Sequence, residues 1–410
     1  MIYPIFSNYI PHWRCTTNQS FSNNCTIFLS CKDSIQFDEI AFSSAALEYD
    51  WICGASAYWA SLYSQIQFLG VLLGTIIAGT LSDIFGRQPL ALISLACGII
   101  ISFFSGLAPS WKILLASRFF VGLSIGGTIV VVCTYVMEML LPKQRMALRA
   151  FFNWGVARLM MTIICYLLPE WRLASFGNAI AALPALLIVF FVFPESPAWL
   201  HSKNRIDEMR ESEKKIARVA GVPYVEIEHK MVQKNKRLID VIRQSNYGKR
   251  LFVLWLMWFT ASLCGYAIDL NSSRISGNLF INQALFSILI AASKGIAILV
   301  INLIGTVFIE YTWDACYLCA IESMPTSMRA SSLGSCSFIA RIGALLSPMI
   351  FFLSNIWSPS AYLTVVIVGI ISLTSSCLFL VDTKDVNLDT VDNQSDTLEQ
   401  EQIPMVQRKQ

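Results

Sequence analysis

Long runs of apolar residues recur along this 410-residue chain, and polar residues gather mainly in the stretches between them. A bilayer core about 30 Å thick is crossed by roughly 20 apolar residues in helical form. Because no water satisfies backbone polar groups in that core, helices are the expected form of such runs. The sequence therefore predicts an all-α polytopic membrane protein. Nine spans are predicted, near 56–79, 90–108, 112–136, 150–168, 173–193, 251–269, 278–304, 331–353 and 360–381.

The overall composition agrees with a membrane protein. Hydrophobic residues make up 55% of the chain and charged residues 14%, whereas soluble domains are about one quarter charged. The net charge of +3 is too small to indicate nucleic-acid binding. The three histidines, His12, His201 and His229, lie outside the predicted spans, and no metalloprotease, phosphate-loop or nucleophile-elbow motif occurs. The sequence therefore predicts no enzymatic activity, no cofactor and no metal site.

The distribution of basic residues predicts the orientation of the spans. Residues 201–250 hold thirteen Lys or Arg and seven Asp or Glu, whereas residues 1–55 hold only two basic residues. Basic loops stay in the cytoplasm. We therefore expect 79–89, 137–149 and 201–250 inside, the N-terminal segment outside and the C-terminal tail in the cytoplasm of a multi-pass plasma-membrane protein.

The N-terminal segment has features of an extracellular region. It contains an even number of cysteines, which suits disulfide bonds in an oxidising space, and the sequence leaves their pairing open. Asn18 and Asn24 are glycosylation acceptors in this segment, and Asn271 is a third in another loop expected outside. The four cysteines are Cys15, Cys25, Cys31 and Cys53.

These patterns divide the chain into five expected regions. Two bundles of helices are separated by a basic cytoplasmic loop, preceded by the cysteine-containing segment and followed by a polar tail of disordered composition. The regions are 1–55 (extracellular segment), 56–200 (N-terminal bundle), 201–250 (cytoplasmic loop), 251–382 (C-terminal bundle) and 383–410 (tail).

Several short motifs follow one another in the order found in one transporter family. GTLSDIFGRQ at 79–88 lies between two spans and resembles the cytoplasmic loop of the major facilitator superfamily. Six further motifs resemble elements of its organic ion transporters, which include organic anion, organic cation and carnitine carriers. They are IPHWRC at 10–15, YDWIC at 49–53, RFFVGLSIGG at 118–127, EMLLPKQR at 138–145, PESPAWL at 194–200 and IESMPTSMR at 321–329.

The resemblance covers most of the chain and implies a fold of twelve helices in two bundles that rock around a central site. It also implies that the first helix, the ninth helix and half of the tenth are absent. Residues 292–305 resemble the eighth helix, and 306–322 resemble only the latter half of the tenth. We therefore expect an incomplete major facilitator fold with about nine complete transmembrane helices, an incomplete C-terminal bundle, and no completed crossing by 306–321.

The resemblance further implies a charged cytoplasmic latch that opens and closes during alternating access. Asp83 and Arg87 lie four residues apart, and the glycines near them permit a tight turn. The alternative is that these are ordinary charges at helix ends. Ala198 replaces the Arg usual in the family's motif, next to Glu195. The predicted gating residues are Asp83, Gly86, Arg87, Glu138, Arg145, Glu195, Glu322 and Arg329.

Charged residues inside the predicted spans are the candidate substrate contacts. Lys294 and Arg341 lie at motif positions where the organic anion branch has a Lys and an Arg. Two fixed cations with no evident carboxylate within the spans favour an anionic or zwitterionic substrate. Arg158 matches no pattern of the family, and it either faces the cavity or lies near the membrane interface.

Other residues of the spans have a structural alternative. Arg118 is followed by three glycines at near-helical spacing, and close helix packing is the expected role of that face. Trp258 and Tyr266 lie along the sixth span, and aromatic faces suit bulky, flat organic ions. Packing or anchoring at the interface is the alternative for each of these two residues.

The expected function is transport of a small organic ion through the lipid bilayer by alternating access. Organic anions are the expected substrates, and the anion branch implies exchange for an intracellular organic anion. One alternative is a carrier of organic cations or carnitine-like zwitterions. The other is a truncated membrane protein that transports nothing, with its missing helices due to splicing or to an error in the gene model.

Overall fold

The computed structural model divides the chain into two compact units, which we describe separately. The first unit comprises residues 1–229, 266–307 and 345–361, and the second comprises 230–265, 308–344 and 362–410. At some helical positions only the backbone is described. The structure describes all residues except 1, 16–20, 22–24, 32–34, 39, 140–153, 225, 227–241, 244, 273–277, 292–311, 314–315, 318, 320–325, 357–359 and 380–410.

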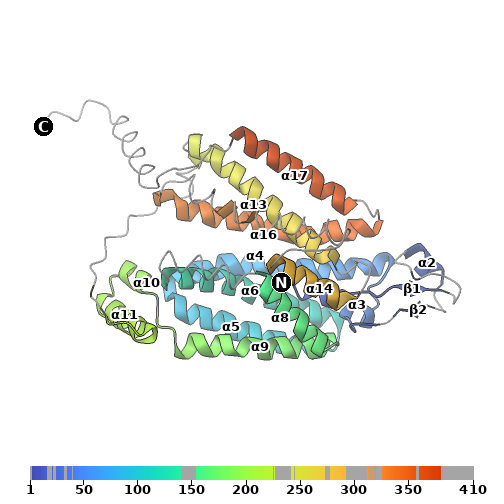
Figure 1. Cartoon of the computed structure of the whole chain (residues 1–410), viewed down its shortest axis with the longest axis horizontal. Helices are drawn as coiled ribbons and strands as arrows, with labels where there is room; N and C mark the ends of the chain where they lie inside the picture. Colours follow the sequence, from blue (N-terminus) through green and yellow to red (C-terminus); the bar gives the residue numbers. More distant parts are fainter. Residues whose placement is uncertain are drawn as a thin grey trace. The chain divides into compact units, whose positions relative to one another are not determined.

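Four long helices form the body of the first unit. Helix α6 packs against α4 and α5, and α9 packs against α5 (Figure 1). Helix α4 ends where Gly86 takes a φ of 114°, a conformation that glycine adopts without steric cost. The bounds are α4 Ala57–Phe85, α5 Arg87–Gly106, α6 Trp111–Met139 and α9 Trp171–Phe191.

Glycines set the close approach of α4 and α6. Gly70 and Gly74 of α4 face the backbone of α6, and Gly122 and Gly126 of α6 face the backbone of α4. A Cβ atom at any of the four would overlap a backbone carbonyl oxygen of the opposite helix. Small residues allow membrane helices to pack in this way. This is the close packing predicted for the glycines that follow Arg118.

Shorter elements complete the membrane part of the first unit. Helix α8 (Trp154–Leu167) lies beside α14 (Leu279–Ala291), as Figure 1 also shows. Helix α1 (Pro4–Ser7) is fully buried, and its Ser7 donates a hydrogen bond to the Tyr63 hydroxyl of α4. The first unit also includes α10 (Pro197–Ser202) and α11 (Ile206–Ala220), at the end of the long helices opposite β1 and β2 (Figure 1).

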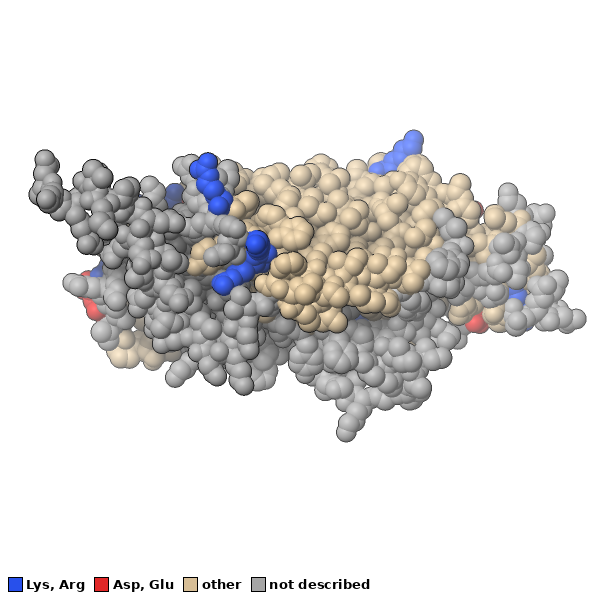
Figure 2. Space-filling model, turned by 90° about the horizontal axis from the view of Figure 1, so that it is seen from above, with Lys and Arg blue, Asp and Glu red and all other residues tan. Residues whose placement is uncertain are grey.

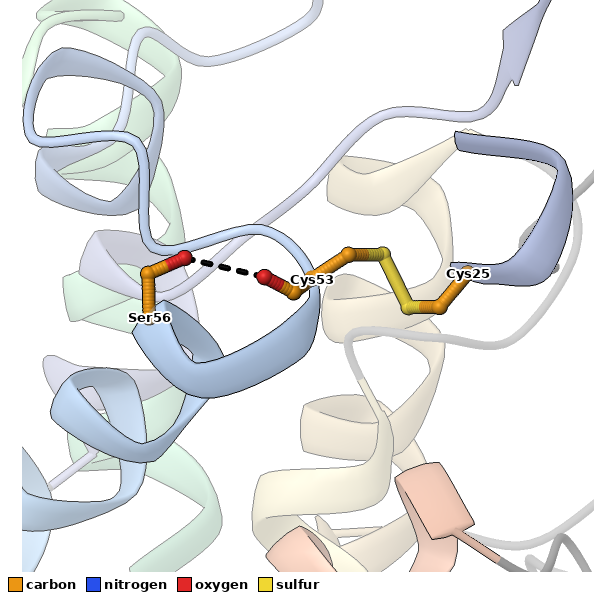
Figure 3. The surroundings of a disulfide bond; sticks show 3 residues. All are labelled: Cys25, Cys53 and Ser56. Atoms are coloured by element: carbon orange, nitrogen blue, oxygen red, sulfur yellow. Dashed lines mark hydrogen bonds between the residues drawn. A yellow bond between two sulfur atoms is a disulfide. The ribbon is translucent and has the colours of Figure 1, made fainter. Parts of the chain in front are cut away.

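A small disulfide-bonded region precedes α4. Strands β1 (Trp13–Arg14) and β2 (Gln36–Phe37) pair antiparallel, and α2 (Cys25–Ser30), α3 (Ala45–Glu48) and the 3₁₀ helix η1 (Gly54–Ser56) surround them. Disulfides join Cys15 to Cys31 and Cys25 to Cys53. The second bond lies at the start of η1, where the Ser56 hydroxyl donates to the Cys53 carbonyl at 3.0 Å (Figure 3).

Loss of the Cys25–Cys53 bond will loosen this region. The bond closes a loop with a sequence separation of 28, and a crosslink of that length is worth about 3 kcal/mol. We expect Cys25→Ser/Cys53→Ser protein to be cut by protease before α4 markedly faster than the parent. Cys97→Ser, which removes an exposed free thiol of α5, is the control. Equal rates of proteolysis for the double variant and this control would contradict a stabilising Cys25–Cys53 disulfide.

The second unit is built on α13 and α16. Residues 245–265 of α13 (Ser245–Asn271) and residues 326–344 of α16 (Thr326–Ile356) belong to this unit, and α17 (Ser360–Phe379) follows. Gly343 of α16 allows the closest approach, since an added Cβ would lie 2.6 Å from the Phe259 carbonyl oxygen of α13. The buried core consists of Leu251, Leu254, Trp258, Ala261, Cys316, Cys336 and Ala340.

Each of the nine predicted spans coincides with a helix in the part of the chain that the structure describes. Six of these helices are long and apolar enough to cross a membrane, and α8 and α17 contain shorter apolar stretches. Figure 2 shows a wide surface without charged side chains, with a few Lys or Arg side chains at its margins. The predicted all-α polytopic fold is confirmed. The end of the seventh predicted span and most of 306–321 lie outside the described residues.

Candidate functional site

The turn between α4 and α5 carries the most extensive part of the predicted latch. Gly86 precedes α5 and has no side chain to cap it. Glu195, from the segment after α9, supplies the missing acceptor. Its Oε1 accepts hydrogen bonds from the backbone N–H of Arg87 at 2.9 Å and of Gln88 at 3.2 Å. A carboxylate is favoured here because a helix N-terminus carries free N–H groups and partial positive charge.

The predicted pair of Asp83 and Arg87 forms at the same turn. The Arg87 guanidinium lies 2.5 Å from Asp83 Oδ1 and 2.9 Å from the Ser82 hydroxyl. The Asp83 side chain is 69% exposed and that of Arg87 only 12%. An ion pair this exposed contributes little stability by itself. The part-buried hydrogen bonds of Glu195 are therefore the stronger part of the arrangement.

The residues after Glu195 tie this turn to further helices. Ser196 caps α10 by accepting from the Trp199 N–H, and the Trp199 indole donates to the Asp83 carbonyl at 3.1 Å. The Ser212 hydroxyl of α11 donates to the Glu195 carbonyl at 2.5 Å. The Tyr135 hydroxyl of α6 donates to the Pro194 carbonyl. We call Asp83, Gly86, Arg87 and Glu195 the α4–α5 clasp.

The structure brings these four together among the eight predicted gating residues. The other four cannot be compared in the same way. Arg145 and Glu322 lie outside the described residues, and so do the side chains of Glu138 in α6 and Arg329 in α16.

Arg158 of α8 is completely buried, with 0% exposure, in a network of polar side chains. It forms an ion pair with Asp269 near the end of α13. Its Nη2 donates to Gln283 Oε1 of α14 at 2.7 Å and to the Ser272 hydroxyl at 3.1 Å. The Gln283 amide donates to the same hydroxyl at 3.0 Å. We call Arg158, Asp269, Ser272 and Gln283 the Arg158 network.

This network corrects the charge count made from sequence. That count found no evident carboxylate within the spans, yet Asp269 neutralises Arg158. The reason is its position: Asp269 is the last residue of the predicted sixth span, whereas α13 continues to Asn271. Charge and alternation along the chain gave no signal that residues 111 positions apart would pair.

Arg118 of α6 is the second buried cation, with 3% exposure. Its guanidinium lies 4.5 Å from the ring centre of Tyr3 and 5.3 Å from that of Tyr63, and 3.4 Å from the Ser175 hydroxyl. Among the described residues no carboxylate lies within ion-pair distance of it. The two rings stabilise its charge by cation–π attraction.

The predicted substrate contacts fall in different settings. Arg341 of α16 is half-buried, and its Nε is buried with no hydrogen-bond partner among the described residues. Trp258 is 1% exposed in the core of the second unit, where its indole donates to the Cys316 carbonyl at 3.3 Å. Tyr266 is half-buried, with its ring 4.9 Å from that of Phe68. Lys294 lies outside the described residues. Substrate contact by these residues stays a prediction.

The side chains of the three predicted glycosylation sites lie outside the described part of the structure. Asn18 and Asn24 lie outside the described residues, and only the backbone of Asn271, the last residue of α13, is described.

A charged cluster lies where α3 of the disulfide-bonded region meets the end of α5 and the start of α9. Glu48 of α3 accepts hydrogen bonds from the Arg172 guanidinium at 2.5 Å and the Trp171 indole at 2.6 Å. Burial opposes ionisation of Glu48, but these hydrogen bonds and the charge of Arg172 hold the pKa of its carboxyl below the ordinary value. Arg172 also donates to the Gly106 carbonyl, so the cluster joins α3, α5 and α9.

Comparison with known proteins gives consistent matches. Residues 32–312 match the family described as "Sugar (and other) transporter". An uncharacterised protein of Caenorhabditis elegans is 34% identical over 96% of this chain and 90% of its own length. That alignment has 459 positions, more than the 410 residues here, so it includes positions that the worm protein has and this chain lacks.

More distant relatives include named transporters and solute carriers. Solute carrier family 22 member 16 of Xenopus laevis is 25% identical over 88% of this chain and 72% of its own length. An organic cation transporter protein of Drosophila melanogaster is 26% identical over 82% and 71%. The inward-open xylose transporter XylE of E. coli has the same fold, with a TM-score of 0.62 and 14% identity over 83% of this chain and 90% of its own.

Proposed function

Because the chain belongs to the sugar (and other) transporter family, and within it to the organic ion transporters of the major facilitator superfamily, we propose that it moves small organic anions across the plasma membrane. It is a membrane transporter and not an enzyme. The relatives are named for organic cations as well as for the wider solute carrier family, so charge preference has to be argued from this chain's own residues.

The observation that carries the anion preference is the setting of Arg341. No carboxylate of the described residues pairs with its guanidinium, and its Nε is buried. Partial removal of a cation from water, with no carboxylate paired to it, carries a desolvation cost. An anionic substrate would relieve that cost, whereas a cationic substrate would add to it. By resemblance, Lys294 contributes a second positive charge to the same site.

The other charges in the described spans do not offset this preference. Asp269 is the acid that an organic cation would need, but Arg158 already holds it. Arg118 adds a further buried positive charge without an acidic partner among the described residues. Arg158 itself, neutralised by Asp269, is a weaker candidate for substrate contact than Arg341. The charge balance therefore favours an anion over a cation or a zwitterion.

The proposed mechanism is alternating access of two bundles around Arg341 and Lys294. The α4–α5 clasp holds the cytoplasmic ends of the N-terminal bundle. The disulfides of the N-terminal segment need an oxidising compartment and so support an extracellular position for that segment. Exchange for an intracellular organic anion follows from the resemblance to the anion branch.

A non-transporting membrane protein is the second candidate. The observation that favours it is the aligned worm protein, which has positions that this chain lacks. Rocking of two matched bundles depends on each bundle being complete. Delivery of the chain to the cell surface without uptake of either an organic anion or an organic cation would favour this second candidate.

Removing the charge of Arg341 tests the anion preference. We expect Arg341→Ala to reduce uptake of a labelled aromatic carboxylate by about tenfold, equivalent to about 1.4 kcal/mol. Arg341→Lys should keep part of the uptake because it keeps a charge. The readout is uptake by oocytes, normalised to surface protein, beside uptake of a labelled quaternary ammonium ion.

The control for this experiment is Arg205→Ala. Arg205 pairs with Glu208 on α11 and its side chain is 49% exposed, so its loss should leave uptake unchanged. An equal fall in carboxylate and ammonium uptake on Arg341→Ala would contradict selection by charge.

A further inference from the structure

The Arg158 network joins parts of the chain that are far apart in sequence. Arg158 comes from α8, in the predicted N-terminal bundle. Asp269 and Gln283 come from α13 and α14, in the predicted C-terminal bundle. All of them lie in the first compact unit, where α8 and α14 pack side by side (Figure 1). If the two bundles rock against each other, this contact is one that has to separate.

Burial shows that the contact is closed in this structure. Arg158 and Gln283 are 0% exposed, Ser287 of α14 is 1% exposed and Thr162 of α8 is 3% exposed. The guanidinium has partners on both α13 and α14, so it holds α8 to two elements at once. A charge-assisted network of this kind is short-ranged and geometrically specific. It therefore favours one discrete arrangement of α8 and α14.

Aromatic residues close the same interface beyond the network. Phe280, at the start of α14, stacks on Phe6 of α1 with ring centres 6.2 Å apart. The ring of Phe280 also meets the ring of Tyr166 of α8 edge-on at 5.4 Å. Phe6 is itself fully buried against Phe42, which follows β2. These rings lie toward the end of α8 and α14 that the disulfide-bonded segment covers.

We propose that the Arg158–Asp269 ion pair is a lock that keeps α8 closed against α14 on the side of the disulfide-bonded segment. Opening of the carrier to that side requires the pair to break. The proposal rests on the alternating access of the proposed function. The lock is suited to opening and closing because both ions regain water when the interface opens, which offsets the lost pairing. Asp269 and Gln283 are thus positioning residues for the closed state.

A natural cysteine reports on this interface. Cys165 is 0% exposed and lies seven residues after Arg158, two turns further along α8 on the same face. The thiol is buried in this structure, in which α8 packs against α14. A membrane-impermeant methanethiosulfonate reagent added outside intact cells will modify Cys165 only when the interface opens.

The experiment compares the modification rate of Cys165 in the full chain and its variants. We expect Asp269→Asn, which keeps the side-chain shape but removes the charge, to raise the rate by about tenfold. Gln283→Ala, which keeps the ion pair and removes the two side-chain hydrogen bonds to Arg158 and Ser272, should raise it by about threefold. The exchanged pair Arg158→Asp/Asp269→Arg should return the rate to near that of the parent. Cys165→Ser should abolish the signal.

Ser287→Ala is the matched control. Ser287 is buried on α14 and its hydroxyl donates to the backbone carbonyl of Gln283, and it is not among the described hydrogen-bond partners of Arg158. A rate for Asp269→Asn no higher than that for Ser287→Ala would overturn the lock, as would an increase that persists after Cys165→Ser. Because labelling does not depend on uptake, faster labelling without transport would support the lock and count against the proposed function instead.

Discussion

Glu195→Ala will reduce transport by more than tenfold while the protein still reaches the membrane. The Glu195 carboxylate accepts hydrogen bonds from the N–H groups of Arg87, Gln88 and Ser196. Each bond to a charged acceptor is worth about 1.5–3 kcal/mol. Alanine leaves the first N–H groups of α5 without this acceptor and frees the turn between α4 and α5. Loss of the clasp is therefore expected to disturb the gating cycle more than the stability of the whole fold.

A substitution at Gly86 would displace the same Glu195 carboxylate by steric overlap. A Cβ at Gly86 would overlap Glu195 Oε2, and Gly86 has a φ of 114° that other residues rarely adopt. Gly86→Ala should therefore displace Glu195 and lower transport to a similar extent. Gly221→Ala separates the two causes, because Gly221 also has a positive φ of 68° but an added Cβ there meets nothing within 4 Å. We expect Gly221→Ala to cost about 1 kcal/mol and to leave transport near normal.

Initial uptake rates at matched surface levels check this prediction. Glu195→Gln should give an intermediate rate, because glutamine keeps one acceptor oxygen but loses the negative charge at the N-terminus of α5. Full transport by both Glu195→Ala and Gly86→Ala would remove the clasp from the gating mechanism.

Gly74→Ala and Gly122→Ala will prevent correct folding of most of the protein. The two helices approach so closely that each new methyl group would overlap a backbone carbonyl oxygen, which cannot move away as a flexible side chain can. Overpacking by a single methyl costs about 1–3 kcal/mol in ordinary cores, and α4 and α6 offer no soft side chain to absorb it. We expect each variant to be mostly retained inside the cell.

Gly334→Ala and Gly369→Ala are matched controls for this experiment. They lie in α16 and α17, and an added Cβ at either position meets no described atom within 4 Å. Both should reach the surface as well as the parent, since alanine favours helix over glycine by about 1 kcal/mol. Surface delivery and thermal stability in detergent are the measurements. Normal values for Gly74→Ala and Gly122→Ala would mean that α4 and α6 are further apart than described.

Apolar runs were enough to predict the helices because membrane length and hydropathy are local properties of the sequence. Thus Ala57–Phe85 and Trp111–Met139 match their predicted spans apart from their ends. Three residues of the clasp could be predicted from sequence for a different reason, because Asp83, Gly86 and Arg87 lie within one short motif. The capping of α5 by Glu195 could not be predicted from local sequence, because 108 positions separate Glu195 from Arg87.

Pairing between distant residues is the part that the sequence could not supply. Four cysteines allow three pairings, and only the fold selects Cys15 with Cys31. The partners of Arg158 come from the ends of two later helices, one of them at the edge of a predicted span. The sequence shows which cations lie within predicted spans. Whether each cation is neutralised by an acid depends on which helices pack together, and a cation without such a partner can bind an anionic substrate.

Uptake by the purified chain in proteoliposomes shows whether this chain itself carries organic anions, because no other carrier is present. We expect saturable uptake of a labelled aromatic carboxylate, faster than that of a labelled quaternary ammonium ion and faster still when the vesicles contain unlabelled carboxylate. Carboxylate entry no greater than in protein-free vesicles, by protein shown to be folded, would contradict it.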